Sequence, residues 1–156
     1  MRIAFHIWIV LAALCLLVSC DSNIVYERNT DIPDEAWHRD SILTYNVPIS
    51  DTLGVYDIVF NNRITGQYQY SNMFVFITIV APDHAHYTDT LECLLADTRG
   101  KWLGRGFGNI WSNKLYYKRN IAFPRKGNYT FYIEQAMRVE SLPHVLDAGL
   151  QIVKVN

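Results

Sequence analysis

Apolar and polar residues alternate along most of the chain after residue 40, which is the pattern of half-buried β-strands. Residues 43–50 alternate strictly, and Pro48 within them suits a strand at the edge of a sheet. The pattern predicts further strands over residues 55–61, 70–80, 87–96, 114–123, 129–137 and 150–155, with a short return strand at 101–103 after a turn at 97–100. These seven to eight short strands predict an all-β fold, an antiparallel β-sandwich with a jelly-roll-like strand order.

Two details of this pattern carry further structural expectations. Asn61 and Asn62 interrupt the stretch that begins at residue 55, so we expect that strand to end there. The stretch 70–80 is apolar on both faces, which predicts a strand at the centre of a sheet with a layer packed on each side.

A continuous apolar run occupies residues 3–18, after Arg2 and with only His6 as an interruption. It is short for a membrane span and typical of the hydrophobic region of a signal peptide. The run ends in the small Ser19, followed by Cys20 and polar residues, which is the pattern of a bacterial lipobox. We predict cleavage between Ser19 and Cys20 and lipidation of Cys20, with an uncleaved membrane anchor as the alternative.

This interpretation divides the chain into a lipoprotein signal peptide (1–19), an acylated cysteine with an irregular tether (20–40), and a β-sandwich domain (41–156). Each buried acyl methylene contributes about 0.8 kcal/mol, so two or more chains on Cys20 hold a protein firmly on a membrane. We therefore expect a lipid-anchored protein of the cell envelope that faces the periplasm. Asp21 leaves the choice between inner and outer membrane open.

Composition and charge exclude several classes of partner. The formal net charge of −1 provides no surplus of positive charge to bind a phosphate backbone, so nucleic acid is excluded as a partner. Cys93 would be the only thiol left in the mature chain apart from the lipidated residue. Its alternation with Leu91 and Leu95 predicts a small buried core residue in preference to a nucleophile.

Two short motifs resemble a metal site and a dinucleotide-binding loop, but each lacks a residue that such a site requires. Asp83-His84-Ala85-His86 places two imidazoles two residues apart, but no third ligand stands at a diagnostic spacing, and a solvated loop is the better interpretation. Gly104-Arg105-Gly106-Phe107-Gly108 lacks the third glycine of a dinucleotide fingerprint, because position 109 is Asn109. We expect these glycines to allow a bulge or a close approach of the backbone. No cofactor and no metal are predicted.

The densest group of aromatic residues is a candidate surface for a partner protein or a glycan, with packing in the core as the alternative. Its members are Trp102, Phe107, Trp111 and Tyr116. Tyr117 is in step with Leu115 and is expected in the core. A hydrolase is the weakest alternative, because no nucleophile, base and orienting group can be named together.

Several spaced blocks resemble the GldH gliding motility lipoprotein family of Bacteroidota, in the same order and over almost the whole mature chain. They are the lipobox and residues 71–77, 89–97, 100–104, 123–124 with 127–129, and 134–138. The resemblance implies a non-enzymatic envelope lipoprotein that supports gliding motility, a process linked in that phylum to the type IX secretion apparatus. It implies other envelope or gliding lipoproteins as partners, and it transfers a defined role to Cys20 alone. The alternative is a carbohydrate-binding β-sandwich lipoprotein.

Overall fold

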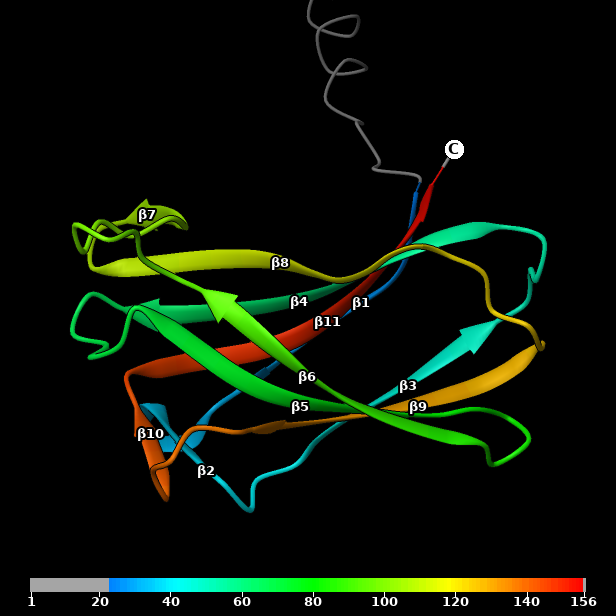
Figure 1. The fold of residues 1–156 in the computed structure, drawn as a ribbon, viewed down its shortest axis with the longest axis horizontal. Coiled ribbons are helices and arrows are strands. Elements are labelled where there is room, and N and C mark those ends of the chain that lie inside the picture. Colours follow the sequence, from blue (N-terminus) through cyan, green and yellow to red (C-terminus); the bar gives the residue numbers. More distant parts are fainter. Residues whose placement is uncertain (1–22, 156) are drawn as a thin grey trace, which may run out of the picture.

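The computed structural model describes residues 23–155, and the predicted signal peptide and Cys20 lie outside that range. Two antiparallel sheets face each other (Figure 1). The first contains, in spatial order, β1 (Ile24–Asp31), β11 (Val145–Val155), β4 (Val55–Thr65), β8 (Ile110–Ile121) and β7 (Arg105–Phe107). The second contains β3 (Leu43–Ile49), β9 (Gly127–Gln135), β5 (Asn72–Val80) and β6 (His86–Leu94). A small pair, β2 (Ala36–His38) with β10 (Ser141–Pro143), follows the 3₁₀ turn η1 (Pro33–Glu35).

The chain crosses repeatedly between the two sheets, and the resulting order is that of a jelly roll. The eight long strands form the sheets β1-β11-β4-β8 and β3-β9-β5-β6, with only β5 and β6 following each other within one sheet. The antiparallel β-sandwich with jelly-roll order is therefore confirmed. Pro48 lies on β3, an edge strand as expected.

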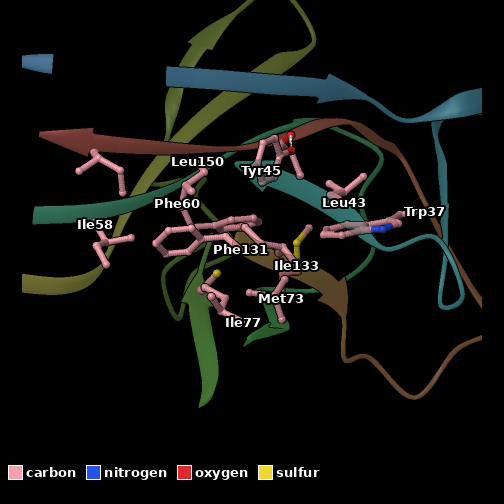
Figure 2. Close-up of a cluster of buried hydrophobic side chains, with 14 of the residues drawn as sticks. Trp37, Leu43, Tyr45, Ile58, Phe60, Met73, Ile77, Phe131, Ile133 and Leu150 are labelled. Atoms are coloured by element: carbon pink, nitrogen blue, oxygen red, sulfur yellow. Dashed lines mark hydrogen bonds between the residues drawn. The ribbon is translucent and has the colours of Figure 1, made fainter. Parts of the chain in front are cut away.

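The core fills the space between the sheets with large side chains in step along each strand. Figure 2 shows Phe131 and Ile133 of β9 and Met73 and Ile77 of β5 opposite Phe60 of β4. All are fully buried. At about 25 cal/mol per Å² of apolar surface removed from water, this layer supplies the main stabilising free energy of the fold.

The predicted tether is wrong from residue 24 onward, because this stretch belongs to the sandwich. β1 pairs with β11 from Ile24 to Asp31. Trp37 of β2 is fully buried, and its indole Nε1 donates to the carbonyl of Ser41 at 2.9 Å. Tyr45 of β3 donates its hydroxyl to the carbonyl of Ala148 at 2.8 Å, with Thr30 Oγ1 at 3.1 Å. The folded domain thus begins about seventeen residues earlier than expected.

Two further expectations need correction. Asn61 and Asn62 do not end their strand, because β4 continues to Thr65 and pairs with β11 and β8 along this length. β5 lies inside its sheet as predicted, between β9 and β6. Its second face, however, is open among the described residues, and Phe76 on that face is exposed.

The turn expected at residues 97–100 is present, and it reverses the chain tightly. The amide of Asp97 donates to the carbonyl of Lys101 at 2.9 Å, and Ala96 forms a bridge with Trp102. Gly100 closes the turn with a positive φ of 79°, a conformation that glycine adopts without steric cost. Residues 101–103 therefore return alongside the end of β6 as predicted.

Candidate functional site

The structure separates the four aromatic residues that the sequence grouped as a candidate surface. Trp102 and Trp111 are half-buried and pack on the core, with ring centroids 6.5 Å apart and Tyr68 at 6.4 Å from Trp102. Phe107 is 89% exposed at the turn between β7 and β8. Tyr116 is 53% exposed on β8, and the guanidinium of Arg119 lies 4.4 Å from its ring centroid. These residues form one inward cluster and two separate exposed rings.

The glycines of the 104–108 segment allow close contacts, as expected. A Cβ at Gly106 would lie 2.6 Å from the ring of Trp111, and one at Gly104 would lie 2.3 Å from Oδ1 of Asn113. Larger residues at these positions would displace the β7–β8 hairpin from the tryptophan cluster. Gly108 has a positive φ of 59° in the hairpin turn.

The outer face of the five-stranded sheet carries a strip of mostly polar side chains, and three of them are buried although they face away from the core. We call this set the polar strip. Its buried members are Asn61 of β4 and Gln151 and Asp147 of β11, with Val59 beside them. Its exposed members are Glu27 and Asn29 of β1, Arg63 of β4, and Lys114 and Tyr116 of β8.

Cross-strand register brings these residues into rows. Asn61 lies between Gly149 of β11 and Lys114 of β8, and Asn29 of β1 is opposite Gly149. A Cβ at Gly149 would lie 1.9 Å from Oδ1 of Asn29. The Asn29 amide therefore occupies the space that a side chain at position 149 would fill. In the next row, Gln151 is opposite both Glu27 and Val59.

Lys114 is opposite Asn61, and its side chain reaches across β4. Its Nζ atom is 3.5 Å from Oε1 of Gln151 and 3.9 Å from Oε1 of Glu27, both of which lie on the far side of β4. Both distances are long for a hydrogen bond or an ion pair, and exposed pairs of this kind contribute about 0–1 kcal/mol. The Lys114 side chain is therefore held only weakly in this position.

Asn61 is only 5% exposed, and neither its Nδ2 nor its Oδ1 atom has a hydrogen-bond partner among the described residues. Buried polar atoms are paired in the great majority of proteins, and leaving one unpaired costs about 1–3 kcal/mol. An orphaned amide in the middle of a sheet face is therefore the clearest sign of a binding group in this structure.

Asp147 and Arg63 form an ion pair at the edge of the polar strip. The Asp147 carboxylate is fully buried and accepts a hydrogen bond from Nε of the half-exposed Arg63, while its Oδ1 atom has no partner among the described residues. Burial raises the pKa of Asp147 above its usual value, and the Arg63 guanidinium opposes that rise.

A hollow of about 590 Å³ opens beside the polar strip at the β7–β8 hairpin. It is lined by Leu103, Gly104, Arg105, Ser112 and Lys114. Two smaller hollows, of about 430 and 290 Å³, lie on the outer face of the other sheet and share Ala136 and Met137. The first of these includes Phe74, and the second includes Phe76.

The histidine motif forms a tight turn, as the interpretation of a solvated loop predicts. The Asp83 carboxylate pairs with Nε of Arg125 at 2.6 Å and accepts from the amide of Ala85 at 3.2 Å. Both histidines are exposed, and His84 has a positive φ of 66°. Within residues 23–155, no group of three or more His, Cys, Asp or Glu side chains could hold a metal ion.

Cys93 is fully buried in the core, as predicted. Burial raises the pKa of its thiol to about 12, with a smaller contribution from Glu92. The thiolate that reacts with electrophiles is therefore scarce at neutral pH.

The ends of β1 and β11 lie together at one end of the sandwich (Figure 1). The amide of Lys154 donates to the carbonyl of Asn23 at 2.7 Å, and Lys154 Nζ pairs with Asp51 at 2.9 Å. Leu53, two residues from Asp51, is almost fully exposed. No helix in the described part of the chain is long and apolar enough to cross a membrane.

Sequence reasoning missed the polar strip because Asn61 and Asn62 were interpreted as a strand end. The sequence did contain a signal for the strip: Asp57, Asn61 and Arg63 are separated by even numbers of residues, so an uninterrupted strand places all three on one face. Extending the predicted strand beyond Asn62 would therefore have predicted a polar outer face that includes Asn61.

The described residues define a jelly-roll β-sandwich whose candidate site is an open sheet face. The chain belongs to the GldH lipoprotein family, whose profile matches residues 24–152, beginning at the first residue of β1. The gliding motility lipoprotein GldH homolog of Christiangramia forsetii is 36% identical over 161 residues, which cover 99% of this chain and 98% of that protein. The gliding motility lipoprotein GldH of Flavobacterium johnsoniae is also 36% identical, over 92% of this chain and 93% of its own length.

One solved structure also resembles the chain, at a low level. It is TmCBM61 in complex with β-1,4-galactotriose, with a TM-score of 0.36 and 11% sequence identity over 83% of this chain and 88% of that one. A similarity this low supports no inference about ligand or activity.

Proposed function

We propose that this protein is a membrane-anchored, non-catalytic lipoprotein of the cell envelope that supports gliding motility through contacts with other envelope proteins, including the type IX secretion apparatus. The observation that carries the proposal is the 36% identity, along nearly their whole lengths, to two proteins named for gliding motility. Lipidation of Cys20 is the anchor in this proposal.

The early start of the domain supports a position close to the bilayer. Only Asp21 and Ser22 separate Cys20 from Asn23, where the described domain begins. A chain of this length spans at most about 11 Å in any conformation. An acylated Cys20 would therefore hold the end of the sandwich that carries Asn23 and Leu53 at the membrane surface.

The opposite end of the sandwich would then face away from the membrane. β4 runs between the two ends, pairing Val55 with Val155 at one and Thr65 with Ile110 of the β7–β8 hairpin at the other. Its eleven residues span about 35 Å at the usual rise of a strand. The exposed Phe107 would be presented to partners at about this distance, whereas Asn61 of the polar strip, six residues from Val55, would lie about 20 Å from the proximal end.

Deletion of this gene from a gliding bacterium, followed by complementation, tests the proposal. Photo-crosslinking residues at Phe76 and Phe107, which are exposed on different surfaces, should capture another envelope protein in complemented cells. The same residue at Thr98, in the exposed 97–100 turn, is the matched control position. We expect loss of gliding on deletion and recovery with the wild-type gene. Unimpaired gliding after deletion, or no captured protein from either surface, would contradict the proposal.

A further inference from the structure

We propose that the outer face of the five-stranded sheet binds a neutral glycan, with the Asn61 carboxamide as its central hydrogen-bonding group and the Tyr116 ring as a stacking surface. This inference goes beyond the proposed role in gliding and rests on separate observations. They are the orphaned amide, the weakly held lysine opposite it, and the exposed ring one row away.

The Asn61 amide is the strongest of these observations. It offers two donors and one acceptor oxygen, and none of them is paired among the described residues. A sugar hydroxyl is both donor and acceptor, so one hydroxyl pair can satisfy the nitrogen and the oxygen together. Satisfying an amide that is otherwise unpaired recovers free energy that the folded protein alone has lost.

A change in the Lys114 rotamer would give a ligand access to this amide. Lys114 is opposite Asn61, and its side chain crosses β4; among the described residues its ammonium group has the 3.5 Å contact to Gln151 and the 3.9 Å contact to Glu27. Surface lysines change rotamer readily, and these contacts are too long to hold the chain strongly. Movement of Lys114 toward the 590 Å³ hollow that it already lines would open Asn61 to a ligand.

The surrounding groups favour a neutral ligand. Arg63 is paired with Asp147, and Lys114 lies near Glu27, so the strip has no strong excess of either charge. The amide of Asn29 lies in the same row as Asn61, two strands away, and the amide of Gln151 lies in the next row. Convergent amides with few unpaired charges suit hydroxyl groups better than phosphate or carboxylate.

Tyr116 completes the arrangement with an apolar surface. It is opposite Val59, which precedes Asn61 by two residues on β4, so Tyr116 and Asn61 share the outer face. Strand spacings of about 4.8 Å across and 6.6 Å along the sheet place their Cα atoms roughly 8 Å apart. The Arg119 guanidinium lies over one side of this ring, 4.4 Å from its centroid. A short oligosaccharide can stack its C–H face on the exposed remainder of the ring while its hydroxyls reach the amide.

Calorimetric titration of the full-length lipoprotein, in a detergent without a sugar head group, tests this site. The probes are cellohexaose, maltohexaose, mannohexaose and chitohexaose, with a neutral glycine-serine peptide as the non-glycan arm. We expect saturable binding of at least one oligosaccharide. Tyr116→Ala should weaken it at least tenfold without altering the melting temperature, because that ring is exposed. Phe76→Ala, on the other sheet, is the matched control and should bind as wild type does.

Asn61→Leu gives a second signature that a structural role would not produce. Removing an unpaired buried amide should raise the melting temperature by about 2–6 °C while abolishing binding. Lys114→Ala should bind at least as tightly as wild type. Failure of all four oligosaccharides to saturate at millimolar concentration would overturn the proposal. Preferential binding of the peptide, or wild-type affinity in Asn61→Leu, would also overturn it.

Discussion

Replacing Trp37 by alanine is expected to lower the free energy of unfolding by about 3–5 kcal/mol, the range measured for truncation of large aromatic core residues. The indole is fully buried and lies at one end of the core cluster (Figure 2), and Trp37 itself belongs to β2, opposite Leu142 of β10. Truncation removes its packing against the core and its hydrogen bond to Ser41, and it leaves a cavity. Urea denaturation followed by circular dichroism measures the loss.

Phe107→Ala is the matched control for this experiment. It also removes a large aromatic side chain, but from a position that is 89% exposed, so the change should stay within about 0.5 kcal/mol. If Trp37→Ala unfolded at the same urea concentration as Phe107→Ala, residues 24–40 would have to be a tether after all. A large difference between the variants supports their place in the sandwich.

Arg63→Met is expected to destabilise the domain by about 3 kcal/mol at pH 7, because it leaves the Asp147 carboxylate buried without its cation. We take the lower end of the range for broken buried pairs, since Arg63 itself is half-exposed to water. Methionine keeps much of the aliphatic volume, so the loss reports mainly on charge. The measurement is the urea midpoint of each variant at a series of pH values.

The pH dependence of that loss identifies its cause. The pKa of Asp147 is raised in the folded state, so its contribution to stability is largest at low pH and is lost as the pH rises through the folded pKa. Removing Arg63 raises this pKa further. The deficit of Arg63→Met should therefore shrink as the pH falls from 7 toward 4, where Asp147 takes up a proton. A deficit that stays constant over this window would contradict the electrostatic explanation.

A double variant provides the control for the pair. Adding Asp147→Asn to Arg63→Met removes the buried charge, so it should recover part of the stability that the single change loses at pH 7. Its stability should also vary less with pH between 4 and 7 than that of Arg63→Met.

The sandwich could be predicted because burial on one sheet face forces alternation in the sequence. β3 shows this in its simplest form, since Leu43, Tyr45, Val47 and Ile49 are all buried and the residues between them are exposed. Turns with glycine at a fixed position, as at Gly100, marked where the strands end. These local signals predicted the fold class, whereas the expected jelly-roll order came from what is common among sandwiches of seven to eight strands.

β1 escaped prediction because its alternation is weak. It is an edge strand on the outside of the sheet, and most of its side chains are exposed, so its hydrogen bonds to β11 leave little trace in hydropathy. Trp37 was a missed signal in the same region, since so large an apolar residue seldom lies in a tether.

The polar strip escaped prediction for a different reason. Its residues come from β1, β4, β8 and β11, and only the cross-strand register brings Asn61, Gln151 and Lys114 together. A single sequence carries no record of that register. The candidate aromatic surface failed to assemble for the same reason, because residues close in the chain lie on opposite faces of β8: Trp111 points inward and Tyr116 outward.

Mass spectrometry of the mature protein tests most directly whether the sandwich is fixed to the membrane by an acylated Cys20. Cells are grown with an alkyne-tagged fatty acid, and the purified wild-type protein is compared with Cys20→Ala and with the matched control Cys15→Ala. We predict a first residue of Cys20 carrying acyl chains in the wild type and in Cys15→Ala, and no label in Cys20→Ala. An unlabelled wild-type protein that retains residues 1–19, or label that persists in Cys20→Ala, would contradict the account.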